Sequence, residues 1–171
     1  MKVYLAGGIS DTDRKKGQAV TAKKLIDMGY DVYAPALNDS INDKSNDPTP
    51  IDIYNGDIDR VVESDVFVVR ISGGNEDGTL SEIGFISGWN EMIQNYNDDI
   101  QTFAPEYYHL KEIKIVAYST NERMMTPQFW NGIASGGFNH LVAGMIDNHG
   151  IFIGGEEEML KYMEELYAEN K

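Results

Sequence analysis

Residues 65–71 have the sequence DVFVVRI, a nearly continuous run of apolar side chains. A strand with one face in water alternates apolar and polar residues, whereas a strand covered by helices on both faces is apolar throughout. We therefore predict that residues 65–71 form the central strand of a parallel sheet.

Short apolar runs and segments with helical periodicity alternate on both sides of this strand. Further strands are predicted at residues 2–6, 31–34, 113–118 and 151–153. Helices are predicted between Gly8 and Gly29 and at residues 51–63, 79–94, 139–147 and 159–167. This alternation implies parallel strands joined by right-handed crossovers. The prediction is a three-layer, doubly wound α/β fold with a five-stranded parallel sheet in flavodoxin-like order, in a single domain over residues 1–171.

The predicted topology also predicts where a ligand binds. In a doubly wound sheet the ligand lies beyond the carboxyl ends of the strands, where the winding reverses. The loops after the first and third strands, residues 7–13 and 73–82, should therefore converge on one site. Two long polar connections, residues 38–50 and 94–111, join other elements. The first is long for a loop in a compact domain, which indicates that it is functional or mobile.

Composition narrows the range of functions. The chain has 171 residues, a formal net charge of -14 and no cysteine, so disulfides, thiolate zinc sites and cysteine nucleophiles are excluded. The negative charge, without a cluster of basic residues, argues against a nucleic-acid partner. The apolar run before Gly7 is too short for a secretion signal or a membrane span, so we expect a cytoplasmic protein without a membrane partner.

The motifs of common cofactor and metal sites are missing from the sequence. It contains neither the glycine pattern of dinucleotide-binding folds nor that of a P-loop. His109, His140 and His149 lack the spacing of metal ligands, and no set of serine, histidine and aspartate stands out. We therefore expect no cofactor and no metal, and we look to the carboxylates for chemistry.

Asp57 is the first candidate, because helical spacing places it beside the apolar stripe of the helix predicted at residues 51–63. A carboxyl group in low-dielectric surroundings holds its proton more tightly, which suits it to protonating a leaving group. The alternative is a surface ion pair with Arg60. The neighbouring Asp59 should point to water.

Glu82 is the second candidate, because it is expected in the first turn of the helix at residues 79–94. There the helix dipole and the unpaired N–H groups favour an ionised carboxylate, and hence a nucleophile. The alternative is that Thr79 and Glu82 form a T-x-x-E capping box. Asp77 lies five residues earlier, across a turn that contains Gly78, and its alternative is an ordinary turn aspartate.

Five segments together resemble the nucleoside 2-deoxyribosyltransferase family, in the family's order and over most of the chain. They are VYLAGG at residues 3–8, NGD at 55–57, SD at 64–65, DGTLSEIG at 77–84 and NHLVAGMIDN at 139–148. The resemblance implies an enzyme that transfers 2-deoxyribose between nucleobases. The chain departs from the short members of the family by continuing past Asn148 into an amphipathic helix.

The resemblance implies a catalytic role for four residues. Glu82 matches the nucleophile that attacks the anomeric carbon and forms a covalent deoxyribosyl intermediate. Asp57 and Asp77 match the pair that binds the base and handles its proton, and Tyr4 matches the tyrosine that hydrogen-bonds the nucleophile. These roles agree with glycosidic chemistry in general, in which one carboxylate attacks the anomeric carbon while another acid assists the leaving group.

The resemblance also implies the binding partners. Gly7, Gly8, Asn139 and Leu141 are expected to contact the substrate, and Asn139 is expected to do so near the 5′-hydroxyl in the active site of a neighbouring subunit. The substrates are then deoxynucleosides and free nucleobases, in nucleotide salvage. Because sites are shared between subunits, the protein is expected to be a homo-oligomer.

Two other functions stay open at this point. The same carboxylate chemistry ends with water in a hydrolase that releases the base of a nucleoside monophosphate, although no basic cluster for a phosphate is evident near Asn139. A pocket that only senses a nucleoside, with Glu82 as a helix cap, is the second alternative.

Overall fold

The computed structural model describes residues 1–8, 12–38, 47–73, 76–103, 110–121, 128–130, 133–135 and 139–171. Most of the predicted loop at residues 38–50, part of the glycine-rich turn after residue 73 and residues 104–109 of the second polar connection therefore lie outside the described residues. The same holds for residues 9–11.

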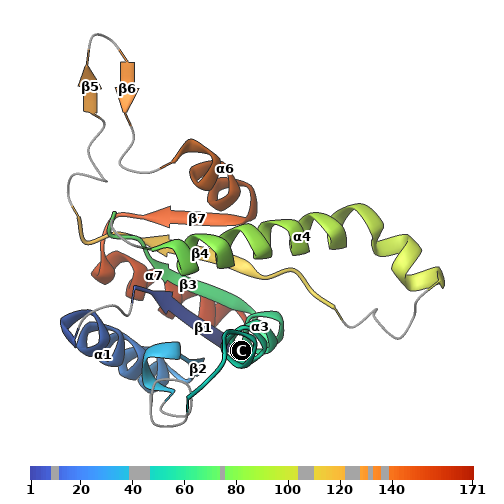
Figure 1. The fold of residues 1–171 in the computed structure, drawn as a ribbon, viewed down its shortest axis with the longest axis horizontal. Helices are drawn as coiled ribbons and strands as arrows, with labels where there is room; N and C mark the ends of the chain where they lie inside the picture. Colours follow the sequence, from blue (N-terminus) through green and yellow to red (C-terminus); the bar gives the residue numbers. More distant parts are fainter. Residues whose placement is uncertain are drawn as a thin grey trace.

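The fold is built on a five-stranded parallel sheet with the order β2-β1-β3-β4-β7 (Figure 1). The strands are β1 (Lys2–Gly7), β2 (Asp31–Tyr33), β3 (Val66–Arg70), β4 (Lys114–Tyr118) and β7 (Gly150–Ile153). This confirms the predicted α/β fold and its flavodoxin-like order. The strand β3 lies between β1 and β4, and Val66 to Val69 are all buried. Both observations agree with the central position that its apolar sequence predicted.

Helices cover both faces of this sheet and make the three layers. They are α1 (Thr12–Met28), α3 (Pro50–Glu63), α4 (Asp77–Phe103), α6 (His140–His149) and α7 (Glu156–Glu169), with a short 3₁₀ turn at Pro35–Leu37. One core lies between the sheet and α1 and α7, where Met159 and Met163 are fully buried. The other lies between the sheet and α3, α4 and α6.

The alternation of side chains along β1 positions the candidate site. Val3 and Leu5 pack into the core under α1 and α7, whereas Tyr4 and Ala6 face the core under α3 and α4. The side chain of Tyr4 is completely buried. A buried phenol needs a hydrogen-bond partner for its hydroxyl group, and that partner comes from α4, as described below.

Local capping signals define where α1 and α3 begin or end. The helix α3 begins with a capping box, in which Thr49 and Asp52 each bond the backbone N–H of the other, followed by Pro50 at a position where its missing N–H is harmless. The helix α1 ends before Gly29, whose φ of 106° is the left-handed conformation typical of a helix end.

Two features of the secondary structure differ from the prediction. The helix α4 continues to Phe103, so residues 95–103 of the predicted connection are helical, with a non-helical backbone at Tyr96. A two-stranded antiparallel sheet, β5 (Gln128–Trp130) and β6 (Ile133–Ser135), was not predicted. In Figure 1 it stands apart from the main sheet.

Some apolar side chains of the predicted helices are exposed. Tyr54 of α3 and Ile26 of α1 are 54% and 51% exposed, whereas Val61 and Leu25 on the same helices are fully buried. None of the helices in the described ranges is long and apolar enough to cross a membrane.

Candidate active site

A hydrogen bond between β1 and α4 lies at the centre of the candidate site. The hydroxyl group of Tyr4 donates to Oε1 of Glu82 at 2.7 Å. Tyr4 is held in place by its own burial and by ring contacts with Tyr33 and Phe67, whose centroids each lie 5.4 Å from its own. The strand thus delivers a rigid donor to a carboxylate on the neighbouring helix.

Glu82 does not cap its helix. The structure places it in the second turn of α4, because the helix begins at Asp77 and its first backbone bond runs from Leu80 N–H to the carbonyl of Glu76. The predicted position in the first turn and the alternative of a capping box with Thr79 are therefore both wrong. The side chain of Glu82 turns instead toward Tyr4 and the sheet.

The surroundings of Glu82 oppose its ionisation. Burial, with a smaller contribution from the nearby charge of Asp57, raises the pKa of Glu82 from 4.5 to about 7, against the opposing effect of the Tyr4 hydrogen bond. Near neutral pH the group therefore exists in both forms, and Tyr4 favours the ionised one. A carboxylate in this condition is a stronger nucleophile than a fully hydrated one.

Asp57 comes to the same place from α3. It is half-buried, and burial raises its pKa, although the nearby hydroxyl groups of Tyr33 and Tyr4 act in the opposite direction. The hydroxyl group of Tyr33 donates to its Oδ1 at 3.3 Å. Arg60 bonds Glu63 at 3.4 Å, so the alternative of an Asp57–Arg60 surface pair is wrong. Asp59 is exposed, as expected.

The two carboxylates border an open hollow of about 230 Å³ between α3 and α4. Its described lining residues are Tyr54, Asp57, Ile58, Gly78, Ser81, Glu82 and Phe85. The described lining therefore combines two carboxylates with two aromatic rings. Such a lining offers a flat apolar ring a surface to stack on, next to groups that can exchange a proton with it.

The other candidate residues lie around this centre rather than in it. Asp77 is exposed at the start of α4, and its Oδ1 accepts a hydrogen bond from Gly78 N–H at 3.1 Å. Gly7 is the last residue of β1, where it is paired in register with Arg70 of β3, and Gly8 follows it. The two loops predicted to converge therefore begin from neighbouring strands.

The residues expected to reach a neighbouring subunit lie at the start of α6. Asn139 is the N-cap of this helix, and its side-chain oxygen accepts from Leu141 N–H at 2.8 Å. Leu141 is 68% exposed. Both side chains are on the surface of the chain.

The site also contains residues that the sequence did not single out. Tyr33 and Asn38 lie behind Asp57, where Asn38 Nδ2 donates to the Tyr33 hydroxyl at 2.9 Å. Phe85 lies three residues after Glu82, so helical spacing could have placed it on the same face. Glu76 is only 4% exposed and accepts from Ser72 N–H at 2.8 Å and from the Ser72 hydroxyl, which anchors the start of α4.

Comparison with known proteins identifies the family. The model of the family described as nucleoside 2-deoxyribosyltransferase matches residues 3–155, which is most of the chain. The chain belongs to this family. As a nucleoside 2-deoxyribosyltransferase family member, it carries Tyr4, Asp57 and Glu82 within the matched range. A search among curated proteins found no match.

Solved structures share the fold of this family member. A conserved protein from Enterococcus faecalis V583 is 25% identical, with a TM-score of 0.70 and coverage of 97% of this chain and 98% of that chain. A 2-deoxyribosyltransferase from Bacillus psychrosaccharolyticus is 14% identical, with a TM-score of 0.53 over 94% of this chain and 90% of that chain. The CMP N-glycosidase BcmB of Clostridium botulinum is 18% identical, with a TM-score of 0.57 over 95% and 98%. The last two likenesses show the fold.

Proposed function

We propose that residues 1–171 form one catalytic domain that transfers 2-deoxyribose between nucleobases, with Glu82 as the covalent nucleophile. The observation that carries the proposal is the partly buried contact between the Tyr4 hydroxyl and Glu82, which lines the same hollow as Asp57 and two aromatic side chains. Family membership supports the same chemistry. Cytoplasmic nucleotide salvage is the role that fits such an activity.

In the first step, a carboxylate oxygen of Glu82 attacks the anomeric carbon of a deoxynucleoside. Because Oε1 accepts from Tyr4, Oε2 is the oxygen left to attack. The bond between the anomeric carbon and the base nitrogen breaks, and its electron pair goes to the base. Asp57, whose pKa is raised by burial, supplies the proton that the departing base takes up.

In the second step, an acceptor base replaces the departed one. Asp57, now ionised, removes a proton from the acceptor nitrogen, which attacks the anomeric carbon and displaces Glu82. Each displacement inverts the anomeric centre, so the product has the configuration of the substrate. Phe85 and Tyr54 form the aromatic walls against which either base can stack.

The decisive experiment incubates the protein with deoxyadenosine and cytosine and separates the products by chromatography. The proposal predicts deoxycytidine and adenine. Free adenine without a new nucleoside would instead identify a hydrolase, and no product at all would indicate a binding module. Mass spectrometry of protein denatured during turnover should show the added mass of one deoxyribosyl group. This added mass should be absent in Glu82→Ala.

A matched control separates loss of chemistry from loss of folding. Asp57→Asn should abolish most of the transfer, whereas Asp59→Asn removes an exposed carboxylate from the same helix and should leave the rate unchanged. Thermal unfolding of each variant shows whether it folds. An equal loss of transfer rate in both variants would show that Asp57 has no specific role in the reaction.

We also propose that the active protein is a homo-oligomer, in which Asn139 of one subunit reaches the sugar bound to another. The exposed position of Asn139 and Leu141 at the start of α6 supports this arrangement. Mixing inactive Glu82→Ala and Asn139→Ala proteins should then restore part of the activity, since some mixed sites contain both intact residues. No recovery, with subunit exchange demonstrated, would mean that each chain builds its own site.

A further inference from the structure

We propose that Tyr33 is a positioning residue for the carboxyl group of Asp57, and that Asn38 holds Tyr33 in this role. The inference rests on the proposed function, because it takes Asp57 as the group that exchanges a proton with the base. Neither residue belongs to the segments that resemble the family, so the contacts alone carry the argument.

The three side chains form a hydrogen-bond chain with one direction. Asn38 Nδ2 donates to the Tyr33 hydroxyl oxygen at 2.9 Å, and that hydroxyl donates to Asp57 Oδ1 at 3.3 Å. An amide NH₂ group can only donate, so it occupies a lone pair of the phenol oxygen. The single hydrogen of the phenol is thereby directed toward Asp57.

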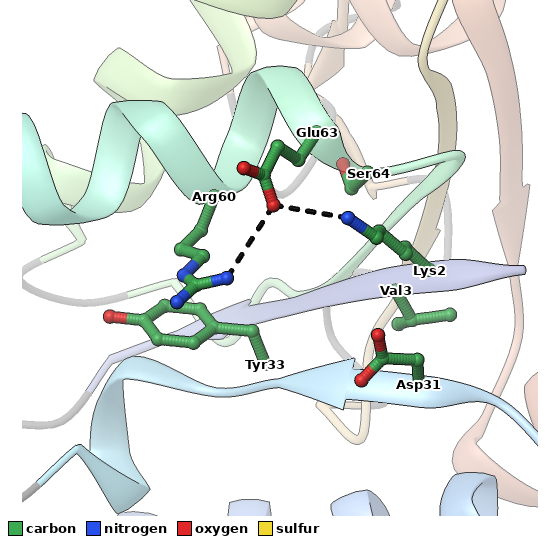
Figure 2. Close-up of a pocket in the computed structure, with 7 residues that line it drawn as sticks. All are labelled: Lys2, Val3, Asp31, Tyr33, Arg60, Glu63 and Ser64. Carbon is green, nitrogen blue, oxygen red and sulfur yellow. Dashed lines mark hydrogen bonds and ion pairs between the residues drawn. The ribbon is translucent and has the colours of Figure 1, made fainter.

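The ring of Tyr33 is held from more than one side. It packs against the ring of Tyr4, and the guanidinium group of Arg60 lies 5.6 Å from its centroid. Figure 2 shows Arg60 over this ring and bonded to Glu63, which also binds Lys2. These contacts restrict the ring to the orientation in which its hydroxyl reaches Asp57.

The direction of these hydrogen bonds determines which oxygen of Asp57 gives up and takes back the proton. Since Oδ1 accepts from Tyr33, the proton of the neutral acid resides on Oδ2, the oxygen left to act on the base. The phenols of Tyr4 on β1 and Tyr33 on β2 influence Asp57, and Asp57 in turn influences the carboxyl group of Glu82 on α4. Because Tyr4 donates to Glu82, Tyr33 gives Asp57 a donor of its own.

The test removes the hydroxyl group and keeps the ring. In Tyr33→Phe the contacts with Tyr4 and Arg60 remain, but the ionised form of Asp57 loses a hydrogen bond. The ¹³C resonance of the Asp57 carboxyl group, assigned by its loss in Asp57→Asn, should then titrate with a pKa higher by about one unit. Asn38→Ala should raise it by less, and the double variant should match Tyr33→Phe alone, because both changes break one chain.

Tyr54→Phe is the matched control, since it removes a phenolic hydroxyl group from the lining of the same hollow but leaves the hydrogen bonds of Asn38, Tyr33 and Asp57 in place. Its Asp57 titration should equal that of the natural protein. An unchanged Asp57 titration in Tyr33→Phe, or additive shifts in the double variant, overturns the proposal. If Tyr33→Phe fails to fold, Asn38→Ala alone decides the question. An unchanged pKa of Asp57 in Asn38→Ala would also overturn the proposal.

The titration is performed on the unliganded protein, so it does not depend on the proposed reaction. If the protein transfers deoxyribose, the limb of the pH–rate profile that reports Asp57 should move to higher pH in Tyr33→Phe, because Asp57 then keeps its proton to higher pH. If no transfer is found, the titration still tests the relay by itself.

Discussion

Replacing Glu82 by glutamine should stabilise the protein at alkaline pH. Burial raises the pKa of Glu82 to about 7 in the folded protein, whereas in the unfolded chain it returns to about 4.5. The folded state therefore binds the proton more tightly. The contribution of protonated Glu82 to the free energy of unfolding is fully present below pH 4.5 and is lost as the pH rises through 7.

The two pKa values set the size of the effect. At about 1.4 kcal/mol per unit, ionised Glu82 lowers the free energy of unfolding at pH 8 by up to about 3 kcal/mol. Glutamine has the same shape, still accepts from Tyr4 and never ionises. The stabilisation by Glu82→Gln should grow from about 1 kcal/mol at pH 5.5 to about 3 kcal/mol at pH 8.

Urea denaturation of both proteins at pH 5.5, 7 and 8 measures this difference, and the range stays above the isoelectric point near 4.4. Asp59→Asn, which removes an exposed carboxylate, is the control and should show no gain that grows with pH. A gain for Glu82→Gln that is the same at pH 5.5 and pH 8 would refute the reasoning, because Glu82 would then titrate equally in both states.

Two further predictions follow from other contacts. Tyr4→Phe removes the hydrogen bond that favours ionised Glu82. The acid limb of the pH profile of kcat/KM for base exchange should therefore move from about pH 7 upward by about one to two units. An unmoved acid limb would show that Glu82 does not cause it. Gly150→Ala places a Cβ 1.8 Å from the backbone oxygen of Ile115 and should lower the unfolding free energy by about 3 kcal/mol or more. Gly144→Ala, whose added Cβ meets no described atom within 4 Å beyond its own helical turn, should be neutral or slightly stabilising in the same denaturation assay.

The sheet could be predicted because its signals are local. The run at residues 65–71 is apolar on both faces, and only a strand between two helical layers satisfies that pattern. The end of α4 could not be predicted. The expected end at Gln94 lies close to the non-helical backbone at Tyr96, so the interruption was found but the helical turns beyond it were missed.

The candidate site was predictable only in part, for a different reason. Thr79 and Glu82 have the spacing of a capping box, and local reasoning cannot see that Tyr4, on a distant strand, offers Glu82 a better partner. The contact of Tyr33 with Asp57 depends on β2 lying beside β1, which follows from the strand order and not from any motif.

The bond between Tyr4 and Glu82 joins residues that are 78 positions apart in the chain. It can exist only when β1 is paired with β3 and α4 is packed on the sheet, so a species without that packing cannot contain it. Catalytic competence should therefore require this packing and not only the local formation of α4. In a denaturation experiment, activity then reports the docking of α4 on the sheet rather than the folding of one segment.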